Sequence, residues 1–201
     1  MLVFDSKKLL EGYTNRFGPL TNNLVEAFTF LFGKISSDAR FADTDTDRRK
    51  LAYCLATFKW ETAHTMQPID ERGGDAYFNR RYGPQTSVGK MLGNTKAGDG
   101  ALYHGRGYVQ ITGRNNYAKA KRLTGIDLIG EPDRAKEPDL AYQIAIQGMT
   151  DGWFTGKKLS NYFIGDNADY LNARRIINGQ DQAEKIADIA RSYSEILREA
   201  K

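Results

Sequence analysis

The stretch "DTDRRKLAYCLATFKWETAH", residues 45–64, contains the helix that matters most for the fold. Apolar side chains recur there at intervals of three and four residues, at Leu51, Cys54, Leu55 and Phe58. This spacing is typical of one face of an α-helix. We therefore expect a helix that begins near residues 45–47 and runs to about His64, with one apolar face turned toward the core.

Glu61 lies at the edge of this apolar face, three residues after Phe58. A carboxyl group there is partly shielded from water, and desolvation disfavours its charged form. A carboxylic acid that keeps its proton near neutral pH can act as a general acid. The pattern leaves a second interpretation equally open, in which Glu61 reaches solvent or pairs with an arginine at the end of the helix.

The remaining pattern is mainly helical. Asp5 and Thr21 are expected N-caps of two early helices. Strand signals are few, and "GALYHGRGYVQITG", residues 100–113, is expected to hold a short strand or a turn. Residues 65–106 are otherwise expected to be mostly irregular. The expected helices, besides the one above, cover residues 5–13, 21–35, 85–92, 108–123, 138–154, 168–177 and 180–199.

Composition and charge exclude several classes of protein. The chain of 201 residues suits a single domain, residues 1–201, in which residues 1–40 pack on or flank the rest. Its single cysteine, Cys54, excludes an internal disulfide and is expected in the core. No apolar run approaches the 18 or so residues of a membrane span, so no stable membrane insertion is expected. The N-terminus lacks the pattern of a signal peptide, so synthesis in the cytoplasm is expected.

The net charge of +4 and the pI of about 9.0 favour an anionic partner, such as cell wall, nucleic acid or a membrane surface. The basic residues are scattered, and no nucleic-acid recognition motif is present. No nucleic-acid partner is therefore expected.

Motifs for metals and cofactors are incomplete. "DTDTD", residues 43–47, has the first acids of a calcium loop, but Arg48 stands where glycine is required. Glu61 and His64 form a Glu-x-x-His pair, and no second copy exists to complete a metal site. Phosphate-binding and dinucleotide-binding loops are absent. No metal and no cofactor are expected.

A polar cluster lies in "YHGRGYVQITGRNNY", residues 103–117. Its amides and hydroxyl stand between aromatic residues, and it contains Gln110, Thr112, Asn115 and Asn116. Such groups hydrogen-bond the hydroxyl and acetamido groups of sugars, and flat rings stack on sugar faces. In the alternative interpretation the segment is a glycine-initiated helix with polar surface residues.

Three motifs together resemble glycoside hydrolase family 19, which contains chitinases and cell-wall lysins. They are "WET" at a helix end, "YHGRGYVQITGRNNY" and "RRIINGQ", and the resemblance covers roughly residues 45–195. It implies a mainly α, lysozyme-like, two-lobed helical fold with a substrate cleft between the lobes. Since disulfides and plant-type insertions are absent, the chain looks more similar to phage endolysins than to plant chitinases.

The resemblance also implies roles for individual residues. Glu61 matches the general acid and Glu71 the general base, while Asp70 and Asp75 remain candidates for the base. The other implied roles are positioning of water by Thr112, sugar binding by Tyr103, Gln110, Asn116 and Asn178, and orientation of the acid by Arg191. Two departures from the family motif are Trp60 in place of the usual histidine and "AHT" in place of a glycine pair.

The expected activity is inverting hydrolysis of β-1,4 glycosidic bonds in peptidoglycan by a monomeric, muramidase-type endolysin. An inverting enzyme needs its carboxyls about 6.5–9.5 Å apart, and a retaining one about 5–5.5 Å. The class further implies that the protein reaches the wall through membrane lesions made by another protein. The alternatives are a chitinase with the same residues and a catalytically inactive wall-binding module.

Overall fold

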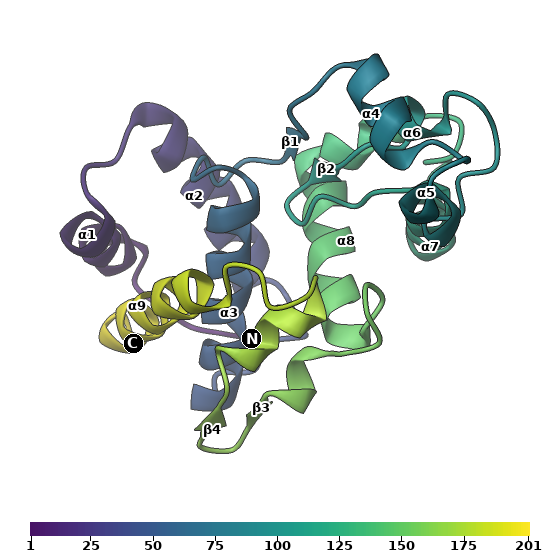
Figure 1. Ribbon diagram of the computed structural model, residues 1–201. Coiled ribbons are helices and arrows are strands. Elements are labelled where there is room, and N and C mark those ends of the chain that lie inside the picture. The colour runs from purple at the N-terminus through teal and green to yellow at the C-terminus, as the bar shows by residue number, and fades with distance from the viewer. The chain divides into compact units, whose positions relative to one another are not determined.

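The computed structural model describes residues 1–201, which are mainly helical, as the sequence predicted (Figure 1). The chain divides into two compact units. Unit 1 comprises residues 1–66 and 149–201, and unit 2 comprises residues 67–148. None of the helices combines the length and apolar character needed to cross a membrane.

Unit 1 is built mainly from long helices. Its elements are α1 (Ser6–Phe17), α2 (Asn22–Ser36), α3 (Asp45–Glu61), the end of α8 (Pro138–Asp151), η2 (Leu159–Asn161), β3 (Phe163–Ile164), β4 (Asn167–Ala168), η3 (Asn172–Ile176) and α9 (Ala183–Glu199). Both expected N-caps are confirmed. The Asp5 side chain accepts hydrogen bonds from the backbone at Lys7 and Lys8, and Thr21 accepts one from Leu24.

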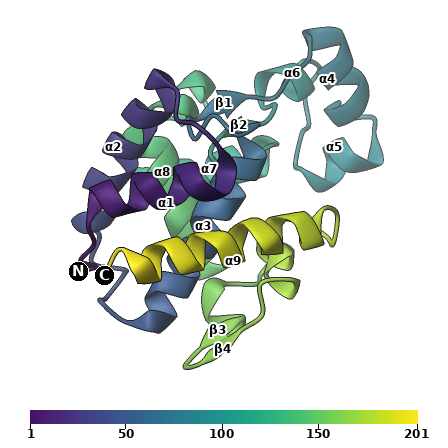
Figure 2. The ribbon, with the colours of Figure 1, turned by 90° about the vertical axis from the view of Figure 1, so that its left-hand side faces the viewer.

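Helix α3 is the centre of unit 1. Every residue from 51 to 58 is at most 1% exposed, so the expectation of a single apolar face is too narrow. A helix that is covered on all sides belongs to the core. Helix α9 packs along α3, and α1 packs on α9 (Figure 2). The ends of the chain also meet in unit 1, where the Asp5 amide donates to the Ala200 carbonyl at 2.8 Å.

Helix α3 ends at Glu61, three residues earlier than expected. Ala63 and His64 have φ angles of 50° and 68°, which lie in the left-handed region. The helix therefore stops beside Glu61, and the side chain of this residue projects from the final turn.

Unit 2 contains shorter elements. They are β1 (Ile69–Asp70), α4 (Asp75–Tyr82), α5 (Ser87–Met91), α6 (Asp99–Leu102), β2 (Arg106–Gly107), α7 (Arg114–Thr124), η1 (Pro132–Lys136) and most of α8. The short helix expected near residues 85–92 is confirmed as α5. The rest of residues 65–106 is mostly irregular, as expected, but it also contains the unpredicted helices α4 and α6.

A short ribbon decides where the candidate residues of unit 2 lie. Strand β1 pairs antiparallel with β2, with Asp70 opposite Arg106. Arg106 also bridges to Ile111, and the Glu71 amide donates to the Gly105 carbonyl at 2.8 Å. The expected strand or turn in 100–113 is thereby confirmed. Because residues 106–111 form this ribbon and its bridge, α7 begins at Arg114 and not at residue 108 as expected.

Candidate active site

Glu61 is the last residue of α3 and is partly buried, with its side chain 16% exposed. Its Oε1 accepts a hydrogen bond from Nη1 of Arg174 at 2.6 Å. Its Oε2 accepts no hydrogen bond from the protein. The two interpretations of the sequence are therefore both correct in part, since Glu61 is shielded from water and also paired with an arginine.

Arg174 is the residue that holds Glu61, and the sequence-based assignment of Arg191 to this role is wrong. Arg174 lies in η3, is only 3% exposed, and donates from Nε to the carbonyl of Asp181 at 3.0 Å. Arg191 lies on the exposed side of α9 and pairs with Asp188. The signal for Arg174 was present in "RRIINGQ", which begins with this residue.

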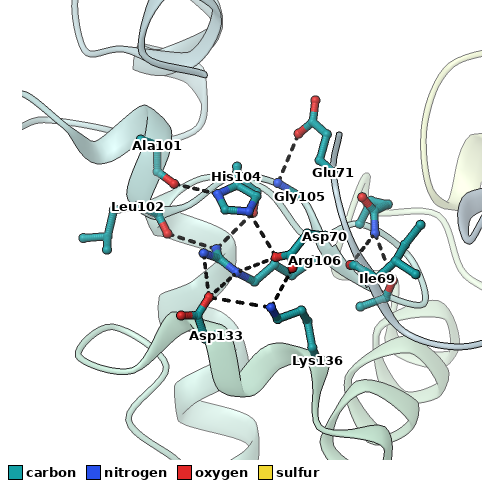
Figure 3. Close-up of polar contacts among 12 residues, drawn as sticks. Ile69, Asp70, Glu71, Ala101, Leu102, His104, Gly105, Arg106, Asp133 and Lys136 are labelled. Atoms are coloured by element: carbon teal, nitrogen blue, oxygen red, sulfur yellow. Dashed lines mark hydrogen bonds and ion pairs between the residues drawn. The ribbon is translucent and has the colours of Figure 1, made fainter. Parts of the chain in front are cut away.

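Glu71 follows β1 in unit 2, and both of its carboxylate oxygens are held. Oε1 accepts from the Tyr82 hydroxyl at 2.8 Å. Oε2 accepts from the Gly105 amide at 3.1 Å, as Figure 3 shows. Each carboxylate oxygen can still accept a second hydrogen bond, so the group can also bind water. Tyr82, whose hydroxyl holds Glu71 from α4, was not among the residues predicted from the sequence.

Gly105 allows Glu71 and Gln110 to approach one another. A Cβ atom on Gly105 would lie 3.0 Å from Oε1 of Gln110 and 3.1 Å from Oε2 of Glu71. The two oxygens therefore converge on one small volume that only glycine leaves open. The Gln110 amide nitrogen is used elsewhere, because it donates to the carbonyls of Ile69 and Gly107, both at 3.0 Å.

Thr112 and Asn116 are tied to the same segment. The Thr112 hydroxyl donates to the Gln110 carbonyl at 3.1 Å, and the Asn116 amide donates to the Thr112 carbonyl at 2.8 Å. Both side chains are half-buried. Thr112 and Asn116 are thus linked to Gln110 by hydrogen bonds within unit 2. Asn178 lies in unit 1, where it is exposed and accepts only from the amide of Gly179.

Tyr103 was expected to bind sugar, and this expectation is wrong for the side chain as it is folded. It is 1% exposed, and its hydroxyl donates to the Ile129 carbonyl at 3.1 Å. Its ring packs against Tyr117 and under the guanidinium of Arg114. Tyr103 therefore supports the segment from inside the core.

Asp70 is embedded in a charged cluster and is a poor candidate for the base. It lies 2.6 Å from Lys136, 3.1 Å from His104 and 3.3 Å from Arg106 (Figure 3). Burial opposes ionisation of Asp70, but the hydrogen bonds from Lys136 and His104 outweigh burial and hold its pKa below the ordinary value. Asp75, the other alternative, is exposed in the first turn of α4.

The cluster around Asp70 also fixes the loop that contains Gly105. His104 stacks on Phe78 with ring centroids 4.5 Å apart, and its two ring nitrogens lie against Asp70 and the Ala101 carbonyl. Arg106 contacts Asp133 on η1 at 3.0 Å. His104 and Arg106 were not among the predicted site residues, although both belong to the "HGRG" motif. No group of three or more His, Cys, Asp or Glu side chains is arranged to hold a metal ion.

Comparison with known proteins identifies the family. The model of glycoside hydrolase family 19, class I chitinase, matches residues 23–160. The chain belongs to this family. Family 19 membership agrees with the fold, because chitinase C from Streptomyces griseus HUT6037 superposes with a TM-score of 0.65. That alignment covers 97% of this chain and 92% of the chitinase at 21% identity. A class IV chitinase from Zea mays gives a TM-score of 0.53 at 19% identity, over 94% and 90% of the two chains.

Similar sequences occur in plants and bacteria. Chitinase 6 from Oryza sativa subsp. japonica is 30% identical over 77% of this family 19 chain and 51% of its own length. A glycosyl hydrolase family 19 domain-containing protein from Haemophilus influenzae is 44% identical over 27% of this chain and 26% of its own. The chain thus spans about half the length of the rice relative and matches about a quarter of the bacterial one.

Proposed function

We propose that the chain is a glycoside hydrolase that cleaves β-1,4 bonds between N-acetylated sugars. Family 19 membership supports the reaction class. The observation that carries the proposal is the asymmetric environment of Glu61, in which Arg174 holds Oε1 and Oε2 has no partner in the protein. An acid needs one free oxygen to carry the proton and a fixed second oxygen to set the direction of transfer.

In the proposed reaction, Oε2 of Glu61 gives its proton to the glycosidic oxygen as the bond to the sugar breaks. The resulting carboxylate is stabilised by the guanidinium of Arg174. Glu71 takes a proton from the water that attacks the sugar carbon, and Tyr82 and Gly105 keep its carboxylate oriented. Direct attack by water inverts the configuration at this carbon. Thr112 positions the water, and Gln110, Asn116 and Asn178 bind sugar groups.

We further propose that the substrate is peptidoglycan and that the protein acts on the wall as a monomeric, phage-type endolysin after release through membrane lesions. The net charge of +4 favours an anionic wall. The second candidate is chitin, which is favoured by the similarity to plant and bacterial chitinases. The two candidates share the same chemistry and differ only in the glycan.

The test is digestion of purified peptidoglycan and of chitin oligosaccharides by the wild type, Glu61→Gln, Glu71→Gln and Asp75→Asn. Mass spectrometry after borohydride reduction identifies each new reducing end, and NMR gives its initial anomeric configuration. We expect new reduced MurNAc ends from peptidoglycan, α-anomers first, loss of turnover in both Glu variants and retention in Asp75→Asn. Cleavage of chitin alone would favour the chitinase. A folded wild type that cuts neither glycan would refute the proposal.

A further inference from the structure

Acidic side chains are unevenly distributed along unit 2. Between Asp75 and Asp127, 51 residues contain nine lysines and arginines and a single acid, Asp99, which gives a net charge of +8. The other 150 residues of the chain contain 24 acids. We call residues 76–126 the basic segment. The rest of unit 2, residues 67–75 and 127–148, has a net charge of −5. The basic residues are scattered along the chain, but here the acids that balance them elsewhere are missing.

The one acid of the basic segment is withdrawn from the surface. The Asp99 side chain is 3% exposed, and its two oxygens accept from Nη2 and Nε of Arg114 at 2.6 and 3.0 Å. Its Oδ2 also accepts from the amides of Thr95 and Lys96 at 2.8 and 3.0 Å. The negative charge of Asp99 is therefore used inside the fold, and no exposed carboxylate lies within residues 76–126.

Seven of the nine bases in the basic segment are exposed. Lys121 pairs with Asp127 at the edge of the segment, with their charged atoms 2.7 Å apart. The exposed bases that have no acidic partner are Arg80, Lys90, Lys96 and Arg122. Exposed charges of one sign that lack counter-charges create a potential that attracts ligands of the opposite sign. The surface of the basic segment therefore favours an anionic partner.

The helices of the basic segment form one packed block within unit 2. Helix α4 packs on α5 and α6. Asn94 joins the end of α4 to the start of α7, because it donates to the Tyr82 carbonyl at 2.7 Å and accepts from the Arg114 amide at 2.9 Å. The Asn115 amide donates to the Leu92 carbonyl at 3.1 Å, which ties α7 to the end of α5. Figure 1 shows α5, α6 and α7 on one side of α8. The exposed bases thus lie on the outside of a single block.

The candidate sugar-binding residues of unit 2 lie in the same segment. Gln110, Thr112 and Asn116 are linked by hydrogen bonds, and Asn116 lies in the first turn of α7. Arg122 follows on the same helix, about 9 Å further along its axis. An extended polymer that reaches Asn116 therefore also meets the positive surface.

Charge and the placement of aromatic rings narrow the choice of partner. Chitin is uncharged, so the positive surface does not favour it. Proteins bind single-stranded nucleic acid through rings that stack on bases, and no aromatic ring of the basic segment is exposed. Peptidoglycan combines β-1,4-linked sugars with peptide stems that carry carboxylates, so it supplies both a glycan and negative charges. Val88 and Met91 on α5 are 38% and 75% exposed, so an anionic lipid surface is the competitor included in the test.

We propose that the basic segment is a docking surface for the carboxylates of peptidoglycan stem peptides. It attracts the wall polymer and holds it beside Gln110, Thr112 and Asn116. Salt screens such attraction, because the Debye length falls from about 10 Å at 0.1 M to about 3 Å at 1 M. The inference rests on the proposed function, because it names the feature that selects peptidoglycan over chitin. Its physical content is a binding affinity, which can be measured without cleavage.

The test measures cosedimentation of the protein with purified peptidoglycan at low salt. All proteins carry Glu61→Gln, so that binding is measured without cleavage. The substitutions added in the basic-segment variant are Lys90→Gln, Lys96→Gln and Arg122→Gln. Those added in the matched control, which loses the same number of charges from exposed positions of unit 1, are Lys8→Gln, Lys157→Gln and Arg198→Gln. We expect about tenfold weaker binding in the basic-segment variant and less than about twofold in the control.

Modified ligands show whether the stem carboxylates are the groups that bind. Conversion of these carboxylates to amides should weaken binding of Glu61→Gln about tenfold and remove the difference between the two triple variants. Addition of about 0.5 M NaCl should have the same effect. Chitin should bind to all three proteins with equal affinity, because it has no charge for the basic segment to attract.

Equal losses in the two triple variants would overturn the inference, because net charge and not its location would then decide binding. Tighter binding of duplex DNA, or of phosphatidylglycerol vesicles, through the same three residues would also overturn it. If the basic-segment variant does not fold, the amidated peptidoglycan decides, and unchanged affinity of Glu61→Gln for it refutes the inference.

The docking surface and the proposed function fail in different ways. A wild type that cuts no glycan, combined with the expected binding differences, refutes the proposed function and leaves the docking surface. Cleavage of peptidoglycan by the wild type, combined with unchanged binding in the basic-segment variant, refutes the docking surface and leaves the proposed function.

Discussion

Oε1 of Glu61 and Nη1 of Arg174 lie 2.6 Å apart, although the two residues are separated by 113 positions in the chain. Glu61 ends α3, and Arg174 lies in η3, so the contact joins two elements of unit 1. The orientation of the candidate acid is therefore a property of the tertiary fold. Local sequence around Glu61 cannot create it.

Arg174→Lys tests this contact while keeping the positive charge. A lysine has one nitrogen, so it cannot donate to Glu61 and to the Asp181 carbonyl in the geometry of a guanidinium. We expect kcat on a soluble chitin or peptidoglycan oligosaccharide to fall by about 10- to 100-fold, and stability to fall by about 1–2 kcal/mol. Arg191→Lys is the control, because Arg191 is exposed and pairs with Asp188. Equal losses in both variants would contradict the assignment of Arg174.

Gly105→Ala tests the convergence of Glu71 and Gln110. The new Cβ would lie 3.0–3.1 Å from an oxygen of each residue, so at least one side chain must move. We expect kcat to fall roughly tenfold or more, because small misplacements of catalytic groups are costly. Gly33→Ala is the control. Gly33 lies in α2 with open space around it, and alanine there should stabilise the helix by about 0.5–1 kcal/mol without changing activity.

Tyr82→Phe tests the hydrogen bond from α4 to Glu71. Without the hydroxyl, Oε1 of Glu71 loses its donor at 2.8 Å, and the carboxylate can turn away from its position. We expect about a fivefold loss of kcat with little change in KM, and a loss of about 1 kcal/mol in stability. Tyr77→Phe is the control. It removes a hydroxyl from the same helix, and this hydroxyl contacts Arg81 and not Glu71. Its kinetics should match the wild type, and a comparable loss of kcat there would argue against a specific role of Tyr82.

Because the ammonium group of Lys59 is buried, we expect the stability of the protein to depend on pH. It is 6% exposed, its ammonium donates to the Tyr13 hydroxyl at 2.6 Å, and it lies 4.7 Å from the ring centroids of Tyr13 and Phe17. Burial lowers the pKa of Lys59 to about 8. Above this pH the folded state releases the proton while the unfolded state keeps it, up to a pKa near 10.4. The penalty of the buried charge is full below pH 8 and is relieved as pH rises.

The measurement for Lys59 is chemical denaturation of the wild type and Lys59→Met from pH 7 to pH 9.5, below the range where most tyrosines ionise. The free energy of unfolding of the wild type should rise relative to that of Lys59→Met, by about 1–3 kcal/mol over this range. The methionine removes the titrating group and fills similar space. Parallel curves for the two proteins would show that Lys59 does not titrate in this window.

The parts of the fold that the sequence predicted have strong local signals. Helix α3 has a clear apolar repeat, and α1 and α2 begin at Asp5 and Thr21, whose side chains cap them. Helices α4 and α6 were missed because Gly74 and Gly98 precede them and provide no side-chain cap. Their short sequences are also too brief to show a helical period.

The candidate site was predictable where a motif fixed the residue, and not where the fold selects a partner. Glu61 was singled out by its place at the edge of an apolar helix face and Glu71 by the family resemblance, and their catalytic roles stay predictions. Arg174 was missed in favour of Arg191, because both are arginines near the end of the chain and the sequence does not show which one is buried. Tyr103 was placed in the site because it shares a motif with Gln110, whereas its side chain lies in the core, where it contacts Ile129 and Tyr117.

The discontinuous make-up of unit 1 has a consequence for the order of events during synthesis. Helix α3, which is buried throughout residues 51–58, leaves the ribosome long before α9, which begins at Ala183 and packs along it. At about 5–20 residues per second, this delay is roughly 6–24 seconds. Limited proteolysis of stalled nascent chains should therefore find α3 cleavable until α9 has emerged. Over that interval residues 51–58 of α3, each at most 1% exposed in the folded protein, lack the contacts with α9 that help to bury them.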